Sequence, residues 1–269
     1  MEDKKVVIIT GAAMGIGKAA VDRFGRAGWQ IAAVDWNGEA LAATEAEMTG
    51  KGYAVDAYVL NVADYDACAA MVADVEAKYG RIDGLYNNAG ILGDRDGILG
   101  FDHETVKDAF EVNVFGSLNL IQLVARVMDR LGIQGAIVNT TSINAEVGTW
   151  DPIGYIGSKG AMKAITQGAA FHLGAQGIRV NAVSPGATIT PMAASVYDVP
   201  PAREAVALNH NRHRWITPEE VANAAFWLIS DEASGVNGIV VAVDDGYATG
   251  KGADLLGIFE EWESEHPQA

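Results

Sequence analysis

The sequence predicts an α/β fold in which about seven parallel strands form a doubly wound sheet with helices on both faces. Short β-branched runs alternate with stretches of helical periodicity, a glycine-rich turn joins the first strand to the first helix, and no Pro- or Ser-rich linker interrupts the pattern. The expected strands lie at 6–10, 30–34, 54–60, 84–86, 136–141, 179–183 and 239–243. The expected helices lie at 16–27, 39–48, 65–79, 105–131, 157–173 and 218–230.

The first strand, Val-Val-Ile-Ile-Thr at 6–10, has the continuous apolar character of a strand buried on both faces. The turn after it, Thr-Gly-Ala-Ala-Met-Gly-Ile-Gly, opens a helix, so its glycines allow a tight turn and a close approach of the backbone to a pyrophosphate. Glycines also serve ordinary turns, but the succession of strand, turn and helix predicts a dinucleotide site. Its expected members are Gly11, Ala13, Met14, Gly15, Ile16 and Gly17.

The second strand is followed by Asp35, eighteen residues after Gly17. A carboxylate there accepts hydrogen bonds from the adenosine ribose and repels a 2′-phosphate. Trp36 and the two residues after it include no cation, and Met14 occupies a turn position where a base would neutralise such a phosphate. This pattern favours NAD over NADP. The alternative interpretation is an acid that merely ends a strand.

The expected helix at 157–173 is preceded closely by Tyr155, and Lys159 follows that tyrosine at a spacing of four. Residues four apart share a helix face, so the lysine ammonium is expected to lower the tyrosine pKa from its ordinary value of about 10 and make a proton acceptor of it. Ser142, which follows the strand at 136–141, is placed to hydrogen-bond the same substrate oxygen. Tyr and Lys at this spacing also occur by chance in helices without a catalytic role.

Charge and cysteine content restrict the class of protein. The chain of 269 residues has 19 Lys and Arg against 35 Asp and Glu, a formal net charge of -16, which argues against a nucleic-acid or anionic-membrane partner. The single cysteine, Cys68, excludes an internal disulfide, and no Cys/His cluster has metal-ligand spacing. No apolar run is long enough for a signal peptide or a membrane span. We therefore expect a soluble, cytoplasmic protein without a metal.

Jointly these motifs resemble the short-chain dehydrogenase/reductase family over residues 6–247. The resemblance rests on the glycine-rich turn at 10–17, Asn-Asn-Ala-Gly at 87–90, Asn113, Ser142, Tyr155, Lys159 and Pro-Gly at 185–186. It implies a single-domain Rossmann fold, hydride transfer between a nicotinamide and a secondary alcohol or carbonyl carbon, and a homotetramer. It assigns residues 1–247 to one cofactor-binding domain that includes the catalytic site and a substrate loop at about 186–216.

The resemblance also implies roles for individual residues. Tyr155 is the general acid/base, Lys159 lowers its pKa and holds the nicotinamide ribose, and Ser142 orients the substrate oxygen. Asn113 helps to hold a water in a proton relay that reaches Lys159. The further cofactor-binding residues expected are Trp36, Asn61, Val62, Asn88, Ala89, Gly90, Pro185, Gly186, Thr188 and Thr190.

Two positions depart from the family pattern. Many relatives have Asp before Val near the adenine, where this chain has Asn61-Val62, and an amide retains the capacity to bond the base. Asp244-Asp245-Gly246 has an acid where relatives often have glycine. Beyond these lies an acidic C-terminal tail, 248–269. It is either a solvated end or, from its apolar residues Leu255, Leu256, Ile258 and Phe259, an amphipathic segment that packs on a neighbouring subunit.

Substrate selection is expected in the 186–216 loop and in residues 144–150, which mix apolar and aromatic types suited to a pocket for a small molecule. The expected substrate-binding residues are Ser142, Asn144, Trp150, Tyr155, Met192 and Tyr197. His210 and His213 are either pocket donors or surface residues. Arg203, Arg212 and Arg214 either bind an acidic substrate or are solvated.

These expectations together predict an NAD-dependent secondary-alcohol dehydrogenase acting on a small molecule. Two alternatives stay open. One is a 3-oxoacyl or carbonyl reductase of the same family, which the missing NADP-binding base disfavours. The other is a non-catalytic dinucleotide-sensing or scaffold protein, which the intact set of Ser142, Tyr155, Lys159 and Asn113 disfavours.

Overall fold

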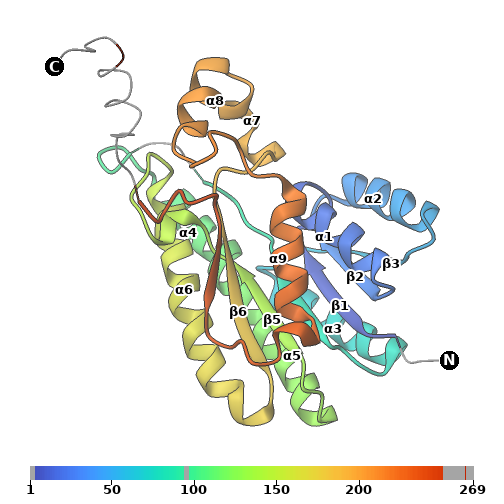
Figure 1. The fold of residues 1–269 in the computed structure, drawn as a ribbon. Coiled ribbons are helices and arrows are strands. Elements are labelled where there is room, and N and C mark those ends of the chain that lie inside the picture. Colours follow the sequence, from blue (N-terminus) through green and yellow to red (C-terminus); the bar gives the residue numbers. More distant parts are fainter. Residues whose placement is uncertain (1–3, 94–96, 251–263, 265–269) are drawn as a thin grey trace.

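The computed structural model describes residues 4–93, 97–250 and 264. Seven strands form one sheet in the order β3-β2-β1-β4-β5-β6-β7, and every neighbouring pair is parallel (Figure 1). They are β1 (Val6–Thr10), β2 (Gln30–Asp35), β3 (Ala54–Val59), β4 (Gly84–Asn87), β5 (Ala136–Thr140), β6 (Arg179–Pro185) and β7 (Val240–Val243). The order reverses between β1 and β4. The predicted doubly wound parallel sheet is confirmed.

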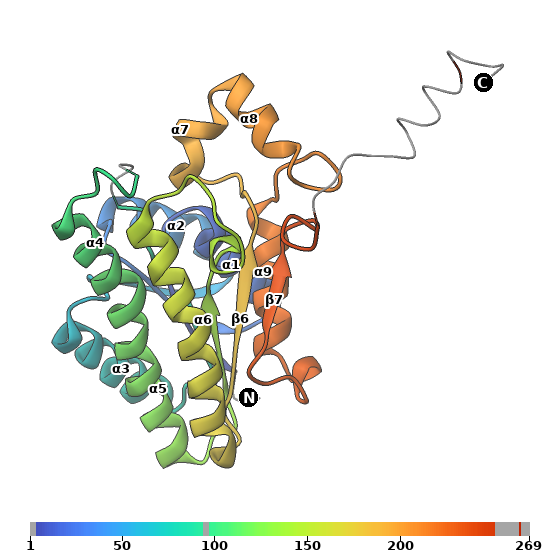
Figure 2. The same cartoon turned by 90° about the vertical axis from the view of Figure 1, so that its left-hand side faces the viewer.

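Helices cover both faces of the sheet, as Figures 1 and 2 show. One face packs against α1 (Gly15–Arg26), α2 (Gly38–Gly50) and α9 (Pro218–Ile229). The other packs against α3 (Tyr65–Tyr79), α5 (Ser117–Leu131) and α6 (Ile153–Leu173). Val7 and Ile9 of β1 point into the first core, while Val6 and Ile8 point into the second, because successive side chains of a strand alternate between faces.

The predicted helix at 105–131 is wrong as one regular element. The segment is divided into α4 (His103–Phe110), a π-helical turn at Glu111–Gly116, and α5. Gly116 in this turn packs against Val62, where an added Cβ would lie 2.6 Å from the valine Cγ2. A π-turn inserts an extra residue into the helix and reorients the side chains around it. Hydrophobic periodicity does not reveal such an insertion.

Two further differences concern elements around the carboxyl ends of the strands. Helix α6 begins at Ile153 instead of residue 157, so Tyr155 lies inside its first turn. The 186–216 loop contains two short helices that the sequence did not predict, α7 (Ala194–Tyr197) and α8 (Pro200–Ala207). Both stand above the sheet in Figure 1, over the carboxyl ends of the strands.

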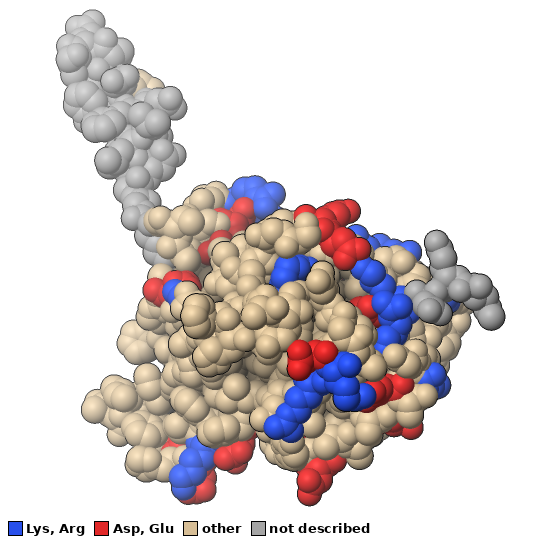
Figure 3. Space-filling view, turned by 90° about the horizontal axis from the view of Figure 1, so that it is seen from below, with Lys and Arg blue, Asp and Glu red and all other residues tan. Residues whose placement is uncertain are grey.

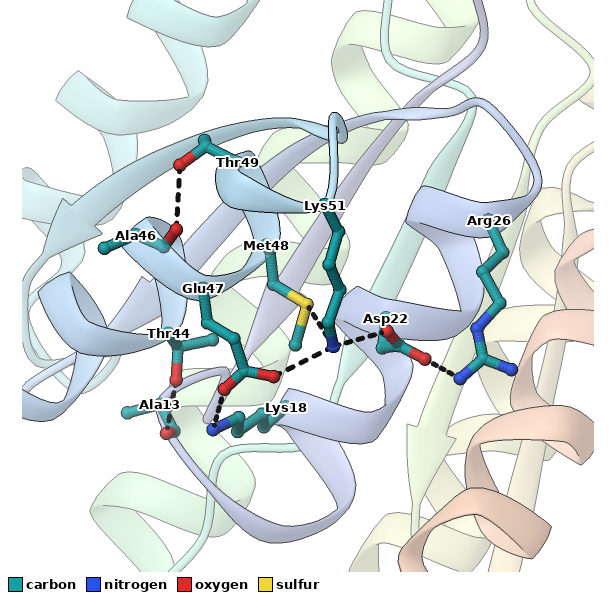
Figure 4. Close-up of polar contacts among 10 residues, drawn as sticks. All are labelled: Ala13, Lys18, Asp22, Arg26, Thr44, Ala46, Glu47, Met48, Thr49 and Lys51. Carbon is teal, nitrogen blue, oxygen red and sulfur yellow. Dashed lines mark hydrogen bonds and ion pairs between the residues drawn. The ribbon is translucent and has the colours of Figure 1, made fainter.

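Charged side chains join α1 to α2 (Figure 4). Glu47 accepts from Lys18 at 2.7 Å and from Lys51 at 2.8 Å, and Lys51 also reaches Asp22 at 3.0 Å. The two ammonium groups lower the pKa of Glu47 to about 2. The pairs are solvent-exposed, so they fix the relative position of the two helices more than they stabilise the fold.

The face seen from below Figure 1 has acidic and basic side chains in scattered, adjacent positions (Figure 3). None of the helices described is long and apolar enough to cross a membrane. Within residues 4–93 and 97–250 no group of three or more His, Cys, Asp and Glu is placed to hold a metal ion. The predicted role of the acidic tail concerns residues that, apart from 248–250 and 264, lie outside the described part of the chain.

Arg179, at the start of β6, binds the carboxyl end of α9. Its guanidinium donates to the carbonyls of Leu228 at 2.7 Å and Ser230 at 3.0 Å, and to two others at 3.3 Å. We expect Arg179→Met to lower the free energy of unfolding by about 2 kcal/mol, because these carbonyls lose charge-assisted donors. Urea denaturation measures this. Arg179→Lys, with a smaller donor group, should give an intermediate loss, and an unchanged midpoint for Arg179→Met would contradict this account of the contact.

Candidate active site

A cleft of about 1390 Å³ lies at the carboxyl ends of the strands, where the strand order reverses. Loops that follow β1 and β4 leave in opposite directions at such a reversal, and the space between them is the usual ligand site of doubly wound sheets. A pocket for one drug-sized ligand has roughly 300–1,000 Å³. The cleft therefore has room for a dinucleotide and a second small molecule.

The glycine-rich turn forms one wall. Gly11 and Gly15 have left-handed φ values of +64° and +53°, and a Cβ on Gly17 would lie 1.9 Å from the Gly11 carbonyl oxygen. Helix α1 begins after Met14, and no side chain caps it. The backbone N–H groups of its first turn therefore have no side-chain acceptor at the end of the helix that borders the cleft. This cradle fits a pyrophosphate.

Four of the six residues predicted for this turn line the cleft: Gly11, Met14, Gly15 and Ile16. Ala13 and Gly17 do not. Ala13 is buried and its backbone is held from two sides, since its N–H donates to Asp35 at 3.0 Å and its carbonyl accepts from the Thr44 hydroxyl at 2.8 Å (Figure 4). These two residues shape the turn from behind instead of touching a ligand.

Asp35 lines the cleft at the end of β2, and its predicted role at the adenosine ribose stays a prediction. One carboxylate oxygen accepts from Ala13 N–H and the other from Asn37 N–H, at 3.0 and 2.9 Å. Each oxygen keeps a free lone pair for a further donor. Beside it, Trp36 is 78% exposed and also lines the cleft. Lys18 forms its ion pair with Glu47 and is not among the lining residues.

The structure brings Ser142, Tyr155 and Lys159 together at the opposite end of the cleft. Ser142 follows β5, and its side chain lies close enough to Tyr155 to lower the pKa of that phenol. Tyr155 and Lys159 share a face of α6, with the ammonium nitrogen 5.4 Å from the centre of the tyrosine ring. The ammonium donates to the carbonyl of Thr140 at 2.8 Å.

The predicted tuning of the tyrosine differs from what the structure shows. Burial raises the pKa of Tyr155 to about 12, against a smaller lowering by the Ser142 hydrogen bond, and Asp151 raises it further. Burial also lowers the pKa of Lys159 to about 8. Helical spacing placed the two residues correctly on one face, but the ammonium is directed to the Thr140 carbonyl instead of the phenol oxygen.

Asn113 is 1% exposed and is absent from the cleft wall. Its amide nitrogen donates to the Ile91 carbonyl at 3.0 Å and to Ser158 at 2.9 Å, and its oxygen accepts from Ile91 N–H at 2.8 Å. Both amide hydrogens therefore have protein partners. The side chain joins the π-turn to the segment after β4 and to α6. Any water held in the predicted relay has to use other atoms.

All the other predicted cofactor residues line the cleft: Trp36, Asn61, Val62, Asn88, Ala89, Gly90, Pro185, Gly186, Thr188 and Thr190. Thr190 packs over the glycine-rich turn, since a Cβ on Gly15 would lie 3.1 Å from its methyl carbon. Asn88 uses its amide nitrogen on the carbonyls of Thr10 and Gly11, at 3.1 and 3.4 Å. It supports the shape of the turn as well as lining the cleft.

Of the predicted substrate residues, Ser142, Asn144, Trp150, Tyr155 and Met192 line the cleft. Tyr197 does not, because its ring packs edge-on against Trp215 with centroids 5.1 Å apart, and it is Trp215 that reaches the cleft. His210 is 1% exposed, behind Gly186, and neither it nor His213 is a lining residue.

The three arginines of the 186–216 loop are not among the residues that line the cleft. Arg212 pairs with Asp245 at 2.5 Å, Arg214 with Glu220 at 2.7 Å, and Arg203 lies over the ring of Tyr197. The interpretation as binders of an acidic substrate is not supported by these contacts.

Sequence reasoning missed many of the lining residues, among them the polar residues Thr140, Asp108, Glu111 and Asp151. Thr140, at the end of β5, was identifiable as a strand-end residue, and Asp151 as an acid one helical turn before Tyr155. Asp108, near the end of α4, and Glu111, at the start of the π-turn, had no such signal, because periodicity did not show where this helix is divided.

Comparisons with known proteins agree with this geometry. A family model described as enoyl-(acyl carrier protein) reductase matches residues 11–248. The 3-oxoacyl-[acyl-carrier-protein] reductase of Thermotoga maritima is 40% identical over 243 residues, covering 90% of this chain and 97% of that one. The chain therefore belongs to the short-chain dehydrogenase/reductase family of oxidoreductases, which bind a nicotinamide dinucleotide.

Two other proteins that are similar to this chain are named for different substrates. The 2,5-dichloro-2,5-cyclohexadiene-1,4-diol dehydrogenase of Sphingobium indicum is 36% identical over 245 residues, covering 90% of this chain and 96% of that one. Among solved structures, an actinorhodin polyketide ketoreductase variant with NADPH has a TM-score of 0.88 at 30% identity, covering 93% of this chain and 99% of that one.

The buried ammonium of Lys159 makes a pH-dependent contribution to stability. Its pKa falls from an ordinary 10.5 to about 8, so between these values the unfolded chain binds more protons than the native one, and stability rises with pH. We expect the unfolding free energy of the native protein minus that of Lys159→Met to rise from pH 8 to 10.5, measured by urea denaturation. Lys163→Met controls for removing a charge from α6. A difference independent of pH would contradict the burial argument.

Proposed function

We propose that this protein is an NAD-dependent dehydrogenase that oxidises a secondary alcohol, with Tyr155 as the general base. The observation that carries the proposal is the meeting of Ser142, Tyr155 and Lys159 at the cleft wall, with the Lys159 ammonium buried 5.4 Å from the centre of the tyrosine ring. An alcohol placed against both oxygens would lose its proton to the phenol while the carbinol carbon loses hydride. Bound NAD would supply the hydride acceptor.

A phenol with a pKa of about 12 is almost entirely protonated at neutral pH, so positive charge close to it is needed to favour the phenolate that accepts the proton. Lys159, with a pKa of about 8, is mostly protonated at neutral pH and supplies one such charge. An oxidised nicotinamide ring carries another. Ser142 donates to the ionised phenol or to the substrate oxygen and lowers the tyrosine pKa further. In this proposal Asn113 acts by positioning Ile91 and Ser158.

The preference for NAD rests on the adenosine end of the cleft. Asp35 lines it, and among the lining residues within 4–93 and 97–250 the only basic one is Lys159, at the far end. A 2′-phosphate there would meet a carboxylate without a compensating cation. The ketoreductase structure with NADPH shows that the fold also accepts the phosphorylated cofactor, so the choice depends on these side chains.

Reduction of a 3-oxoacyl thioester is the second candidate, favoured by the Thermotoga maritima relative. The charges of the cleft weigh against an anionic carrier, because Asp108, Glu111 and Asp151 line it. A homotetramer remains part of the proposal, supported by Phe171 on α6 and Phe115 in the π-turn, which are 86% and 49% exposed. A single domain over 1–247 and a cytoplasmic location stay predictions.

Tyr155→Phe should reduce kcat/KM by about 10³-fold, because the phenyl ring cannot accept the alcohol proton. NADH formation followed at 340 nm over a panel of secondary alcohols measures it, and fluorescence titration checks that NADH still binds. Tyr65→Phe, on exposed α3, is the matched control. Native turnover by Tyr155→Phe would exclude Tyr155 as the general base, whereas no turnover by the native protein, with NADH still bound, would leave the dinucleotide-sensing alternative.

Asp35→Ala should raise KM for NAD by about 10-fold or more, because hydrogen bonds to a charged acceptor are lost. The variant should also use NADP better than the native protein does, since the repelling charge is gone. Steady-state kinetics with both cofactors measure the ratio. Glu39→Ala removes an exposed acid of the neighbouring α2 and should leave it unchanged. Identical kinetics for Asp35→Ala and the native protein would refute the assignment.

A further inference from the structure

Asp151 brings an uncompensated negative charge to the wall of the cleft. Its carboxylate accepts from the Asn144 amide at 2.5 Å and from the Thr149 hydroxyl at 3.3 Å, and both bonds use the same oxygen, Oδ2. These donors are neutral, and Asp151 takes part in none of the ion pairs formed by residues 4–93 and 97–250. The residue is exposed and lines the cleft, so its carboxylate is accessible to a ligand.

Hydrogen bonds hold this carboxylate beside the proposed reaction centre. The same Asn144 that donates to it also donates its backbone N–H to Ser142 Oγ, at 3.2 Å. The Asp151 charge acts on Tyr155 and raises the pKa of its phenol. Burial lowers the pKa of Lys159 without a contribution from Asp151, so the ammonium and the carboxylate do not offset each other. An unpaired acid here disfavours the phenolate that alcohol oxidation needs, and a cation bound at the acid would remove that effect.

The residue before this acid is a fully exposed tryptophan. Trp150 is 103% exposed and lines the same cleft. The face of an indole ring attracts a cation electrostatically, more strongly than other aromatic side chains do, and also contacts the carbon atoms bonded to that cation. A carboxylate or phosphate on a ligand would be repelled by Asp151, and a neutral group would leave its charge uncompensated. The two adjacent side chains therefore suit an ammonium group.

We propose that the substrate is a secondary alcohol carrying an ammonium group, which Asp151 and Trp150 bind while the hydroxyl lies at Tyr155. One side chain, that of Asn144, separates the carboxylate from Ser142, which favours a nitrogen close to the carbinol carbon. The inference rests on the proposed function and names its substrate class. The carbinol C–H bond breaks with transfer of hydride to NAD, the O–H proton passes to the tyrosine, and the product is an aminoketone whose ammonium group is unchanged.

Three alcohols that share one 2-hydroxypropyl group test the inference. They are β-methylcholine, its neutral isostere 4,4-dimethylpentan-2-ol, and the anion 3-hydroxybutanoate. The readouts are kcat/KM with NAD and calorimetric binding of each alcohol to the protein–NADH complex. We expect the cation to exceed its neutral isostere by about 10-fold in both readouts, the size of an accessible ion pair together with one contact between a cation and an indole. The anion should fall below the neutral alcohol.

Asp151→Asn tests the charge without changing the volume of the side chain. The ratio of cation to neutral isostere should fall from about 10-fold to about 2-fold, the part that the indole supplies. This variant also changes the electrostatic environment of Tyr155, but that effect is common to both alcohols and cancels in the ratio. Glu146→Gln is the matched control, because it removes an acid of the same segment that pairs with Lys163 and is not a lining residue. Its ratio should equal the native one.

Two variants of Trp150 separate the aromatic face from apolar contact. Trp150→Leu keeps an apolar side chain but has no aromatic face, so the ratio of cation to neutral isostere should fall. Trp150→Phe keeps an aromatic face with a weaker attraction for cations, so the ratio should lie between those of Trp150→Leu and the native protein.

The outcomes distinguish this inference from the proposed function. Turnover of the neutral alcohol at least as fast as that of the cation would overturn the ammonium inference and leave the dehydrogenase intact. A cation preference unchanged in Asp151→Asn would also overturn it, as would tighter binding of the anion than of the neutral alcohol. Binding of the cation that Asp151→Asn weakens, without NADH formation from any of the alcohols, would support the subsite and count against the proposed function.

Discussion

The junction between the ends of β1 and β4 is the constraint on which the cleft depends. There the hydroxyl of Thr10 accepts from the backbone N–H groups of Asn88 and Ala89, both at 3.0 Å. These bonds hold together two loops that leave the sheet in opposite directions. The Asn88 amide adds a bond to the Thr10 carbonyl. Because the glycine-rich turn starts from this point, its position relative to the segment that follows β4 is set here.

Close backbone packing extends this constraint to the cofactor side. Gly17 lies so near the Gly11 carbonyl that no side chain fits between α1 and the turn. Thr44 and Asp35 hold Ala13 from two further elements. The turn is therefore rigid without any ligand contact of its own, and rigid backbone donors are what anion binding at a helix start requires.

Burial has opposite effects on the two titrating groups of the site. It raises the pKa of Tyr155 and lowers that of Lys159, so the low-dielectric environment favours the neutral form of each. Solvent screens charges little at such a site, so a charge added nearby changes both pKa values strongly. In the proposed function, the oxidised nicotinamide would be such a charge.

Local patterns were sufficient for the order of strands and helices, the glycine-rich turn, Asp35 at a strand end, and the shared face of Tyr155 and Lys159. Each depends on residues close together in the chain. The π-turn around Asn113, the displacement of Tyr197 by Trp215, the direction of the Lys159 ammonium and the neutral partners of the Asp151 carboxylate were decided by tertiary structure. Burial and the choice of hydrogen-bond partners depend on which elements meet in space. Sequence periodicity carries no information about that.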